Sequence, residues 1–144
     1  MFWQQRLGVG GRSFTIWKIR TLRPPFDQFG QPIPENKRGS WVGSFLRRTR
    51  LDELPQLAIV LVGDMSLIGP RPLLPRDQPM NPTVRLTVRP GITGWAQVNG
   101  GTLLSPSERD ALDEGYVRNA SFWLDLRIVM MTLRVMIWGQ RRPD

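Results

Sequence analysis

The sequence predicts one domain of the α/β class, of the α+β type, in which a compact and mostly helical fold carries a small β-sheet. Its 144 residues are enough for one modest hydrophobic core and too few for two. Apolar residues recur at helical spacing in residues 54–61, whereas residues 14–20 alternate apolar and polar side chains as strands do. Residues 1–144 contain no internal repeat and no linker, so we expect a single domain.

Local patterns predict the elements of the first half. The alternation in residues 14–20 predicts a strand, and the four prolines in residues 22–36 predict a loop. Apolar residues within 41–46 indicate a short helix. A second helix is expected over residues 53–62, with Gly63 as its stop.

The second half is expected to alternate loops, short strands and helices. Residues 73–82 are rich in proline and should form a loop, whereas residues 84–88 and 95–98 are predicted as short strands. Ser107, with an aspartate three residues later, predicts a helix through residue 118. Ser121 should cap the final helix.

The balance of charged residues points to anionic partners. Lys and Arg total 20 against 12 Asp and Glu, a net charge of +8, and 18 of the basic residues are Arg. The guanidinium fork binds phosphate, so nucleotides, lipid phosphates, membrane headgroups and nucleic acid all fit. Neither Cys nor His is present, which excludes disulfides, thiol chemistry, imidazole bases and the usual zinc sites. Carboxylates remain as the candidate nucleophiles, bases and ligands of a hard metal such as Mg²⁺.

The pair Asp52-Glu53 stands between an arginine-rich segment and the start of an apolar helix. Pro55 suits the first turn of that helix, so Asp52 is expected to be its N-cap. The positive end of the helix dipole and the nearby arginines favour an ionised, nucleophilic carboxylate at neutral pH. An ordinary N-cap with solvated charges has the same pattern, and taken by itself such a pair is far more often a cap than a catalytic pair.

Several motifs surround this pair in a fixed order. They are residues 14–21 (FTIWKIRT), 46–57 (LRRTRLDELPQL), 63–73 (GDMSLIGPRPL), 89–100 (RPGITGWAQVNG), 113–119 (DEGYVRN) and 121–126 (SFWLDL). Together they resemble the bacterial sugar transferase family, the monotopic phosphoglycosyl transferases that begin lipid-linked glycan assembly. The resemblance runs from about Gln5 to Trp138 and is far more specific than any one of its motifs.

The resemblance implies a reaction. In this family an aspartate of the Asp-Glu pair attacks the sugar-bearing phosphate of a nucleoside diphosphate sugar and releases the nucleoside monophosphate. The covalent phosphosugar then passes to polyprenyl (undecaprenyl) phosphate, which initiates exopolysaccharide, O-antigen or other glycoconjugate assembly. By this resemblance Asp52 is the nucleophile of a UDP-sugar phosphoglycosyl transferase, and Glu53 is the best Mg²⁺ ligand. Without the family, Glu53 would be read as a solvated carboxylate of the first turn.

Basic residues are expected to hold the phosphates. Arg71 lies between two prolines, which pre-organise its backbone for an anion clamp, although a surface arginine in a Pro-bounded loop fits the sequence equally well. The resemblance assigns phosphate binding to Lys18 and Arg47, with Arg20 and Arg89 as weaker candidates. Arg48 and Arg50 have the pattern of solvated charges.

Two acidic residues match the C-terminal part of the family pattern, Asp113 and Asp125, and both are candidates for substrate binding. Asp125 stands in an apolar helix, where an unpaired carboxylate would cost several kcal/mol. It should therefore have a cation, a metal or a hydrogen-bond donor beside it. A structural salt bridge is the leading alternative for its role.

Residues 122–138 form the longest apolar region, interrupted by two polar stripes. The pattern fits a core helix with two polar seams and an amphipathic membrane-surface helix equally well. Family members usually begin with an apolar helix that enters the membrane, whereas this sequence starts after that point. It also lacks the Asp-x-Arg-x-Thr that often precedes the first cytosolic helix. We therefore expect weak peripheral binding, without an N-terminal anchor, to anionic lipids on the cytoplasmic face of the bacterial inner membrane.

Two alternatives belong to other functional classes. An arginine-rich, tryptophan-rich module could bind nucleic acid, but the six Trp are scattered rather than clustered as a stacking platform, so nucleic acid is not expected. An inactive, truncated family member could serve as a binding partner of another enzyme. The sequence leaves the sugar, the glycan and the oligomeric state open.

Overall fold

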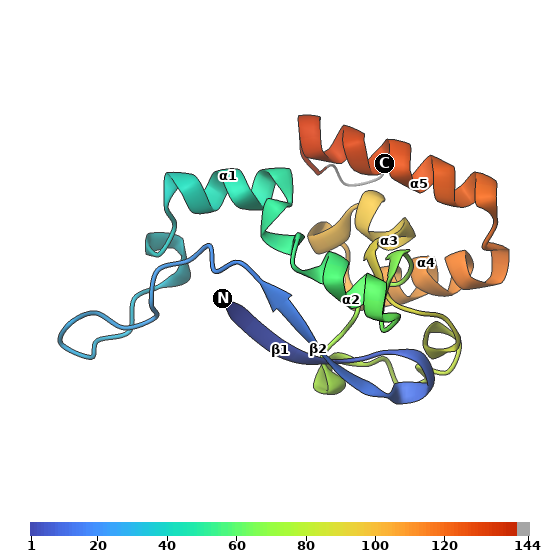
Figure 1. Cartoon of the computed structure of the whole chain (residues 1–144), viewed down its shortest axis with the longest axis horizontal. Coiled ribbons are helices and arrows are strands. Elements are labelled where there is room, and N and C mark those ends of the chain that lie inside the picture. Colours follow the sequence, from blue (N-terminus) through green and yellow to red (C-terminus); the bar gives the residue numbers. More distant parts are fainter. Residues whose placement is uncertain (141–144) are drawn as a thin grey trace.

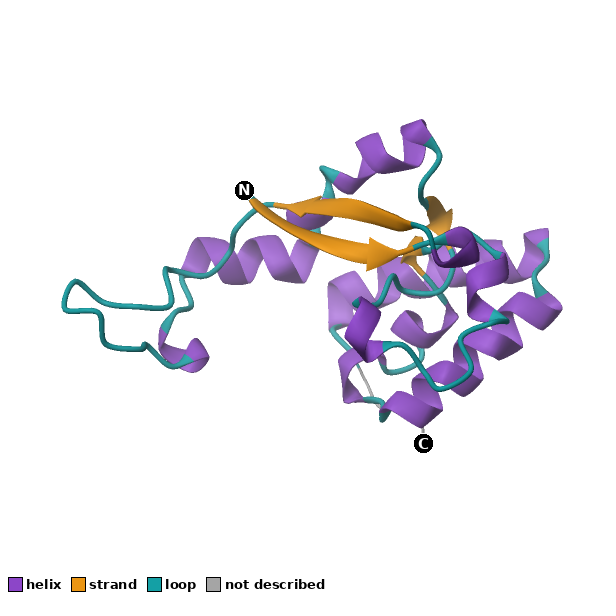
Figure 2. Cartoon of the chain, turned by 90° about the horizontal axis from the view of Figure 1, so that it is seen from below, coloured by secondary structure: helices purple, strands orange, loops and turns teal. Residues whose placement is uncertain are grey.

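The computed structural model describes residues 1–140 as five α-helices, two small sheets and several 3-10 turns. A β-hairpin lies along one side of the fold, and helices α1 and α5 lie along the opposite side (Figure 1). The predicted α+β class with a high helical content is confirmed. Residues 22–39 extend away from this body in both views (Figures 1 and 2).

The hairpin consists of β1 (Phe2–Leu7) and β2 (Ser13–Lys18), paired antiparallel with Phe2 opposite Lys18. Strand β2 confirms the strand predicted over residues 14–20. Its buried Phe14 and Ile16 form one core cluster with Ile59 and Met65. Strand β1 was not predicted, because polar residues fill its centre and its stability comes from pairing with β2.

Helix α1 (Trp41–Thr49) confirms the first predicted helix, and helix α2 (Gln56–Val62) ends at Gly63 as expected. The predicted start of α2 was wrong. A 3-10 turn occupies Leu51–Glu53, and Asp52 caps no helix. Pro55 has no N–H to give to residue 51, so regular α-helical bonding begins only at Gln56.

A second sheet pairs two three-residue strands in parallel, β3 (Ser66–Ile68) and β4 (Gly91–Thr93). Strands this short show no periodicity in the sequence, so neither was predicted. The glycines beside them permit the close approach of the two segments. A Cβ at Gly91 would collide with the backbone nitrogen of Gly69.

Both strands predicted in the second half were wrong. Residues 85–87 form a 3-10 turn and Trp95–Val98 forms the short helix α3. Periodicity does not separate a four-residue apolar strand from a buried helical turn. Ala96, Gln97 and Val98 are all buried, so the segment lacks the alternation of buried and exposed residues that would identify a strand.

Helices α4 (Pro106–Asn119) and α5 (Phe122–Trp138) complete the chain as predicted. Ser121 caps α5 as expected, whereas α4 is capped by Ser105 rather than Ser107. Ser105 and Glu108 form a capping box, in which each side chain bonds the backbone of the other.

Helix α5 has both a packed side and an exposed apolar side. Ile128 is fully buried and packs in a second core cluster with Val98 and Tyr116. Phe122 and Trp123 at the start of the helix are about three-quarters exposed. Within residues 1–140 no helix combines the length and the apolar character that a bilayer crossing requires.

Candidate active site

The Asp52-Glu53 pair lies in the 3-10 turn between α1 and α2, directly beside the end of β2. The backbone carbonyl of Asp52 accepts a hydrogen bond of 3.0 Å from the N–H of Ile19. The preceding residue, Lys18, places its Nζ 2.6 Å from Glu53 Oε1. Two segments far apart in the sequence are therefore held together by a backbone hydrogen bond and an ion pair. The predicted residues Lys18, Asp52 and Glu53 form one cluster.

The turn depends on an unusual backbone conformation at Arg50. Its φ of 56° makes it the only non-glycine residue with a positive φ among residues 1–140. The left-handed conformation costs a side-chain-bearing residue about 1 kcal/mol. It ends α1 and redirects the chain, because the Arg50 N–H bonds back to the helix while its carbonyl accepts from the N–H of Glu53 at 3.1 Å. Strain of this kind, next to a carboxylate pair, is typical of a functional site.

Arg50 also contributes charge to the site, so its interpretation as a solvated residue was wrong. Burial lowers the pKa of its guanidinium, Glu53 opposes this shift, Arg71 adds to it and Asp52 opposes it. These interactions place Arg50 within electrostatic range of the acid pair and of Arg71. No sequence signal separated it from Arg48, which is exposed on α1.

The pKa of Asp52 moves in the opposite direction from the expectation. Burial of the carboxyl raises it above its usual range, and the neighbouring Glu53 raises it further. Lys18 lowers it, as do a hydrogen bond to the backbone and the more distant Arg47. Because Asp52 lies in a three-residue 3-10 turn and does not cap α2, the stabilisation expected from the dipole of that helix does not apply.

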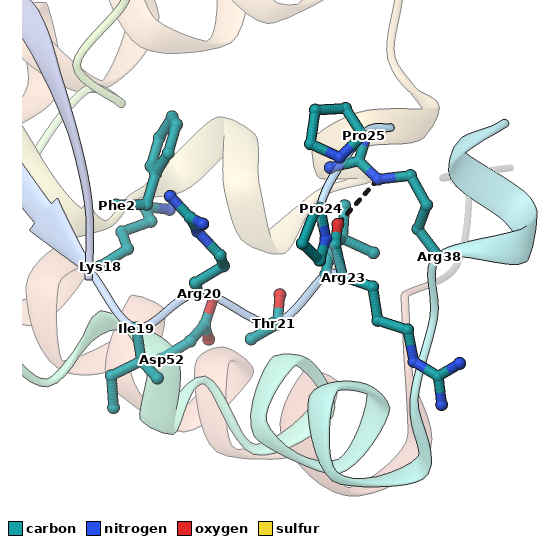
Figure 3. Close-up of a pocket in the computed structure, with 11 residues that line it drawn as sticks. Phe2, Lys18, Ile19, Arg20, Thr21, Arg23, Pro24, Pro25, Arg38 and Asp52 are labelled. Atoms are coloured by element: carbon teal, nitrogen blue, oxygen red, sulfur yellow. Dashed lines mark hydrogen bonds between the residues drawn. The ribbon is translucent and has the colours of Figure 1, made fainter. Parts of the chain in front are cut away.

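Asp52 opens onto a cavity of about 380 Å³ (Figure 3). Its basic lining comes from Lys18, Arg20, Arg23 and Arg38, and Arg38 Nε donates to the carbonyl of Arg23 at 2.9 Å. The remaining wall is mostly apolar and consists of Phe2, Ile19, Thr21, Leu22, Pro24 and Pro25. A carboxylate at the edge of a basic cavity is suited to reaction with a bound phosphate.

A second cavity, of about 260 Å³, has a different lining, which includes none of Lys18, Asp52 and Glu53. Arg6, Arg71 and Arg109 line it, together with Asp77 as the one acidic residue. A narrow gap is bordered by Lys18, Glu53, Arg6 and Arg71, and it shares the two arginines with this cavity. Burial lowers the pKa of Arg6, and the adjacent Arg71 lowers it further, so this cavity holds excess positive charge.

Glu53 has one carboxylate oxygen that could bind a metal ion. Its Oε1 bonds Lys18, whereas its Oε2 is buried without a hydrogen-bond partner. No group of three or more acidic ligands occurs among residues 1–140. Mg²⁺ is commonly held by one or two carboxylates, with substrate phosphates and water as the other ligands, so the residues present fit it.

The other candidates lie at varied distances from this site. Arg47 is exposed in the last turn of α1 and acts on Asp52 only through its charge. Arg89 lines a separate cavity beside Gly63 and Asp64, away from the acid pair. Asp125 accepts a hydrogen bond of 2.8 Å from the Tyr116 hydroxyl, which supplies the partner that its apolar helix required.

Asp113 is enclosed and bound to Arg85, a residue that sequence reasoning did not select. Arg85 Nη2 lies 3.2 Å from Asp113 Oδ2, and Nη1 lies 3.3 Å from Asp110 Oδ1. Burial raises the pKa of Asp113 to about 6, although Arg85 opposes the shift. The one sequence feature that could have indicated a buried Arg85 is its position between apolar neighbours. That feature was attributed to a strand over residues 84–88.

Comparison with known proteins decides the family. The profile described as bacterial sugar transferase matches residues 1–139. The chain belongs to the bacterial sugar transferase family. Lys18, Asp52 and Glu53, which lie in one cluster, are among the residues on which the family resemblance was based. Family membership favours the sugar transferase interpretation over the nucleic-acid-binding alternative.

Individual members of the family show the same relationship. The chain is 45% identical to an uncharacterized sugar transferase, EpsL, of Bacillus subtilis, over 92% of this chain and 67% of that protein. It is 42% identical to the UDP-glucose:undecaprenyl-phosphate glucose-1-phosphate transferase of Xanthomonas campestris pv. campestris, over 97% and 32% of the two chains. It is 40% identical to the UDP-N-acetylgalactosamine-undecaprenyl-phosphate N-acetylgalactosaminephosphotransferase of Aeromonas hydrophila, over 96% and 36%. The chain thus spans about a third of the latter two sugar transferases.

Proposed function

We propose that this sugar transferase domain moves a sugar 1-phosphate from a nucleoside diphosphate sugar, of the UDP-sugar class, to polyprenyl phosphate. The observation that carries the proposal is the position of Asp52, on a basic cavity and beside the Lys18–Glu53 pair. The relatives from Xanthomonas and Aeromonas are named for UDP-sugars and undecaprenyl phosphate, which supports both substrates. The glycan produced is expected to be an exopolysaccharide or a related lipid-linked glycoconjugate.

The proposed reaction has two displacements at the same phosphorus. An Asp52 carboxylate oxygen attacks the phosphorus that bears the sugar, and the bond from this phosphorus to the bridging oxygen breaks. The nucleoside monophosphate leaves with that oxygen and its electron pair. A phosphate oxygen of the acceptor then attacks the acyl phosphate, and the Asp52 carboxylate is released unchanged.

The residues around Asp52 lower the repulsion between these anions. Lys18 and Arg20 line the reacting cavity, Arg71 borders the narrow gap beside Glu53, and Arg50 acts on both carboxylates through its charge. Glu53 would hold Mg²⁺ through its free Oε2. When bound, the ion would supply charge neutralisation at the diphosphate oxygens.

The two cavities suit different halves of the reaction. The Asp52 cavity has an apolar wall and borders α1, because the carbonyl of Thr21 packs directly against Gly43. The exposed α1 face carries Trp41 and Phe45. Because both displacements occur at Asp52, this cavity is proposed to receive the sugar-bearing phosphate of the donor and then the phosphate of the lipid-borne acceptor, while the arginine-lined cavity binds the nucleotide of the water-soluble donor.

The exposed apolar faces also support attachment to a membrane. Helices α1 and α5 lie on the same side of the fold (Figure 1) and expose large apolar side chains. These are Trp41, Val42, Phe45, Phe122, Trp123, Leu126, Met130, Leu133, Ile137 and Trp138. Together with the net charge of +8, they favour peripheral binding to an anionic bilayer, which we propose to be the cytoplasmic face of the inner membrane.

Detection of the covalent adduct tests the proposed function. The chain is incubated with Mg²⁺ and a panel of UDP-sugars, and intact-protein mass spectrometry is used to find the mass of one phosphosugar. We expect the adduct on the native protein together with UMP release, and neither on Asp52→Asn. An adduct of equal yield on the Asn variant would refute the assignment of Asp52. Full UMP release after removal of metal by a chelator would refute the role of Glu53.

A further inference from the structure

Arg85 is a buried arginine that the proposed reaction does not use directly. It lies in the 3-10 turn Arg85–Thr87, and its side chain is only 5% exposed. An enclosed guanidinium is stable only when acceptors satisfy it and a negative charge compensates it. Here Asp110 and Asp113 supply the charge, both from α4.

The shortest contact of Arg85 is made with the backbone of another residue. Its Nη2 donates to the carbonyl oxygen of Arg71 at 2.7 Å. The same Nη2 is 3.2 Å from Asp113 Oδ2, but that oxygen has no contact with hydrogen-bonding geometry. Asp113 therefore holds Arg85 by charge, while the directed hydrogen bond from Nη2 goes to Arg71.

The turn that carries Arg71 is supported from two sides. On one side it is held by strand β4, because the N–H of Gly91 donates to the carbonyl of Pro70 at 2.9 Å. On the other side Pro72 offers no N–H, and Arg85 bonds the Arg71 carbonyl. Arg85 is thus the link from the Arg71 backbone to helix α4.

We propose that Arg85, held by Asp113 and Asp110, is a positioning residue that orients Arg71 toward the donor phosphates. The proposal rests on the proposed function only for the identity of the ligand. It explains why Asp113 is buried beside an arginine rather than exposed in either cavity. Arg85 itself contacts no substrate, so its effect on turnover must pass through Arg71.

A double-mutant cycle tests this route. Arg85→Lys keeps a cation for the two acids but removes the planar fork that reaches both Asp110 and the Arg71 carbonyl. We expect kcat/KM for UMP release to fall about tenfold or more, since small displacements of a binding group are costly. In an Arg71→Gln background, the same substitution should change kcat/KM less than twofold. Arg118→Lys, an exposed change on α4, is the matched control and should leave activity unchanged.

The alternative outcomes are distinct. An equal loss from Arg85→Lys in both backgrounds would show that Arg85 acts on the whole fold rather than through Arg71. No loss in either background would also overturn the proposal. If Arg85→Lys does not fold, Asp113→Asn takes its place in the cycle, with the same dependence on Arg71 expected.

A second measurement does not require turnover. The Arg71 Nε–H signal in the NMR spectrum of the native protein, assigned by its loss in Arg71→Lys, should be sharp and should broaden or shift in Arg85→Lys. An unchanged signal would refute positioning even in an active enzyme. A changed signal in a protein that releases no UMP would uphold positioning while the proposed function fails.

Discussion

Replacement of Asp113 by Asn is expected to change how the stability of the fold depends on pH. Burial raises the pKa of Asp113 to about 6 in the folded chain, against 3.8 for an ordinary aspartate. Arg85 lowers it, whereas Asp110 raises it and Arg109 lowers it, so all the charged neighbours together do not cancel the cost of burial. The folded chain therefore binds this proton more tightly than the unfolded chain does.

The sign of the effect follows from this difference. The contribution of Asp113 to stability is most favourable below about pH 4, where the carboxyl is protonated in both states. It is lost as the pH rises through the folded pKa near 6, because only the folded state then resists ionisation. A shift of about two pH units corresponds to about 3 kcal/mol. The Asn side chain has no proton to lose, so this loss should be absent from the variant.

Urea unfolding of the two proteins at pH 4, 5, 6 and 7.5 measures the effect directly. The free energy of unfolding of Asp113→Asn, minus that of the native protein, should increase by about 3 kcal/mol between pH 4 and pH 7.5, so the variant gains stability relative to the native protein. The chain contains no His, so no imidazole titrates in this window. A difference that stays constant across the range, or that moves in the opposite direction, would show that burial does not dominate the titration of Asp113.

Three further predictions concern the site and its surroundings. Arg50→Gly and Arg50→Ala should lose UMP release equally, because both lack the guanidinium. In thermal unfolding the Ala variant should be less stable than the Gly variant by about 1 kcal/mol, because of the positive φ. Equal stabilities would contradict the strain argument. Arg109→Gln should weaken UMP binding, measured by calorimetry, about tenfold. Arg76→Gln removes an exposed charge near the same cavity and should change UMP binding little. Equal losses would mean that the overall positive charge, and not a contact from Arg109, holds the nucleotide. Trp123→Ser should reduce flotation with vesicles of anionic lipid, and the binding that remains should fall with added salt; unchanged flotation would exclude α5 from the membrane contact.

The elements that the sequence predicted correctly are those with a strong local signal. Ser121 and Gly63 bound helices through capping chemistry that depends on only a few neighbouring residues. The alternation around Ile16 likewise predicted β2, because one face of that strand is buried. These signals do not depend on contacts between distant segments.

The errors arise where distant segments decide the local structure. The strands at residues 66–68 and 91–93 pair where Gly69, Gly91 and Gly94 allow two backbones to approach closely, and no sequence periodicity indicates such a contact. Arg85 lies in a 3-10 turn and pairs with two acids on α4, a contact between distant segments that the local sequence does not indicate. The predicted start of α2 was wrong for a local reason. Pro55 was assigned to the helix, but α2 begins one residue later, at Gln56.

The site shows the same division. Lys18, Asp52 and Glu53 were selected through the family resemblance, and the structure brings them together. Arg50 could not be distinguished from other arginines, because its importance lies in a backbone angle and in the burial of its side chain. Arg89 is a residue type that commonly binds phosphate, but it lines a cavity away from the acid pair.

The hydrogen bond between Ile19 and Asp52 also bears on how the length of the chain can vary. It joins the two ends of the segment formed by residues 20–51. The outer part of this segment, residues 22–39, projects from the body of the fold (Figure 2). Once the ends of such a loop are fixed, each doubling of its length costs only about 0.6 kcal/mol of closure entropy. Insertions at the tip near Phe29 and Gly30 should therefore leave the acid pair in place. A fluorescent reporter domain could be inserted there with little effect on the position of Asp52, whereas one extra residue within β2 would turn Lys18 to the opposite face of the strand.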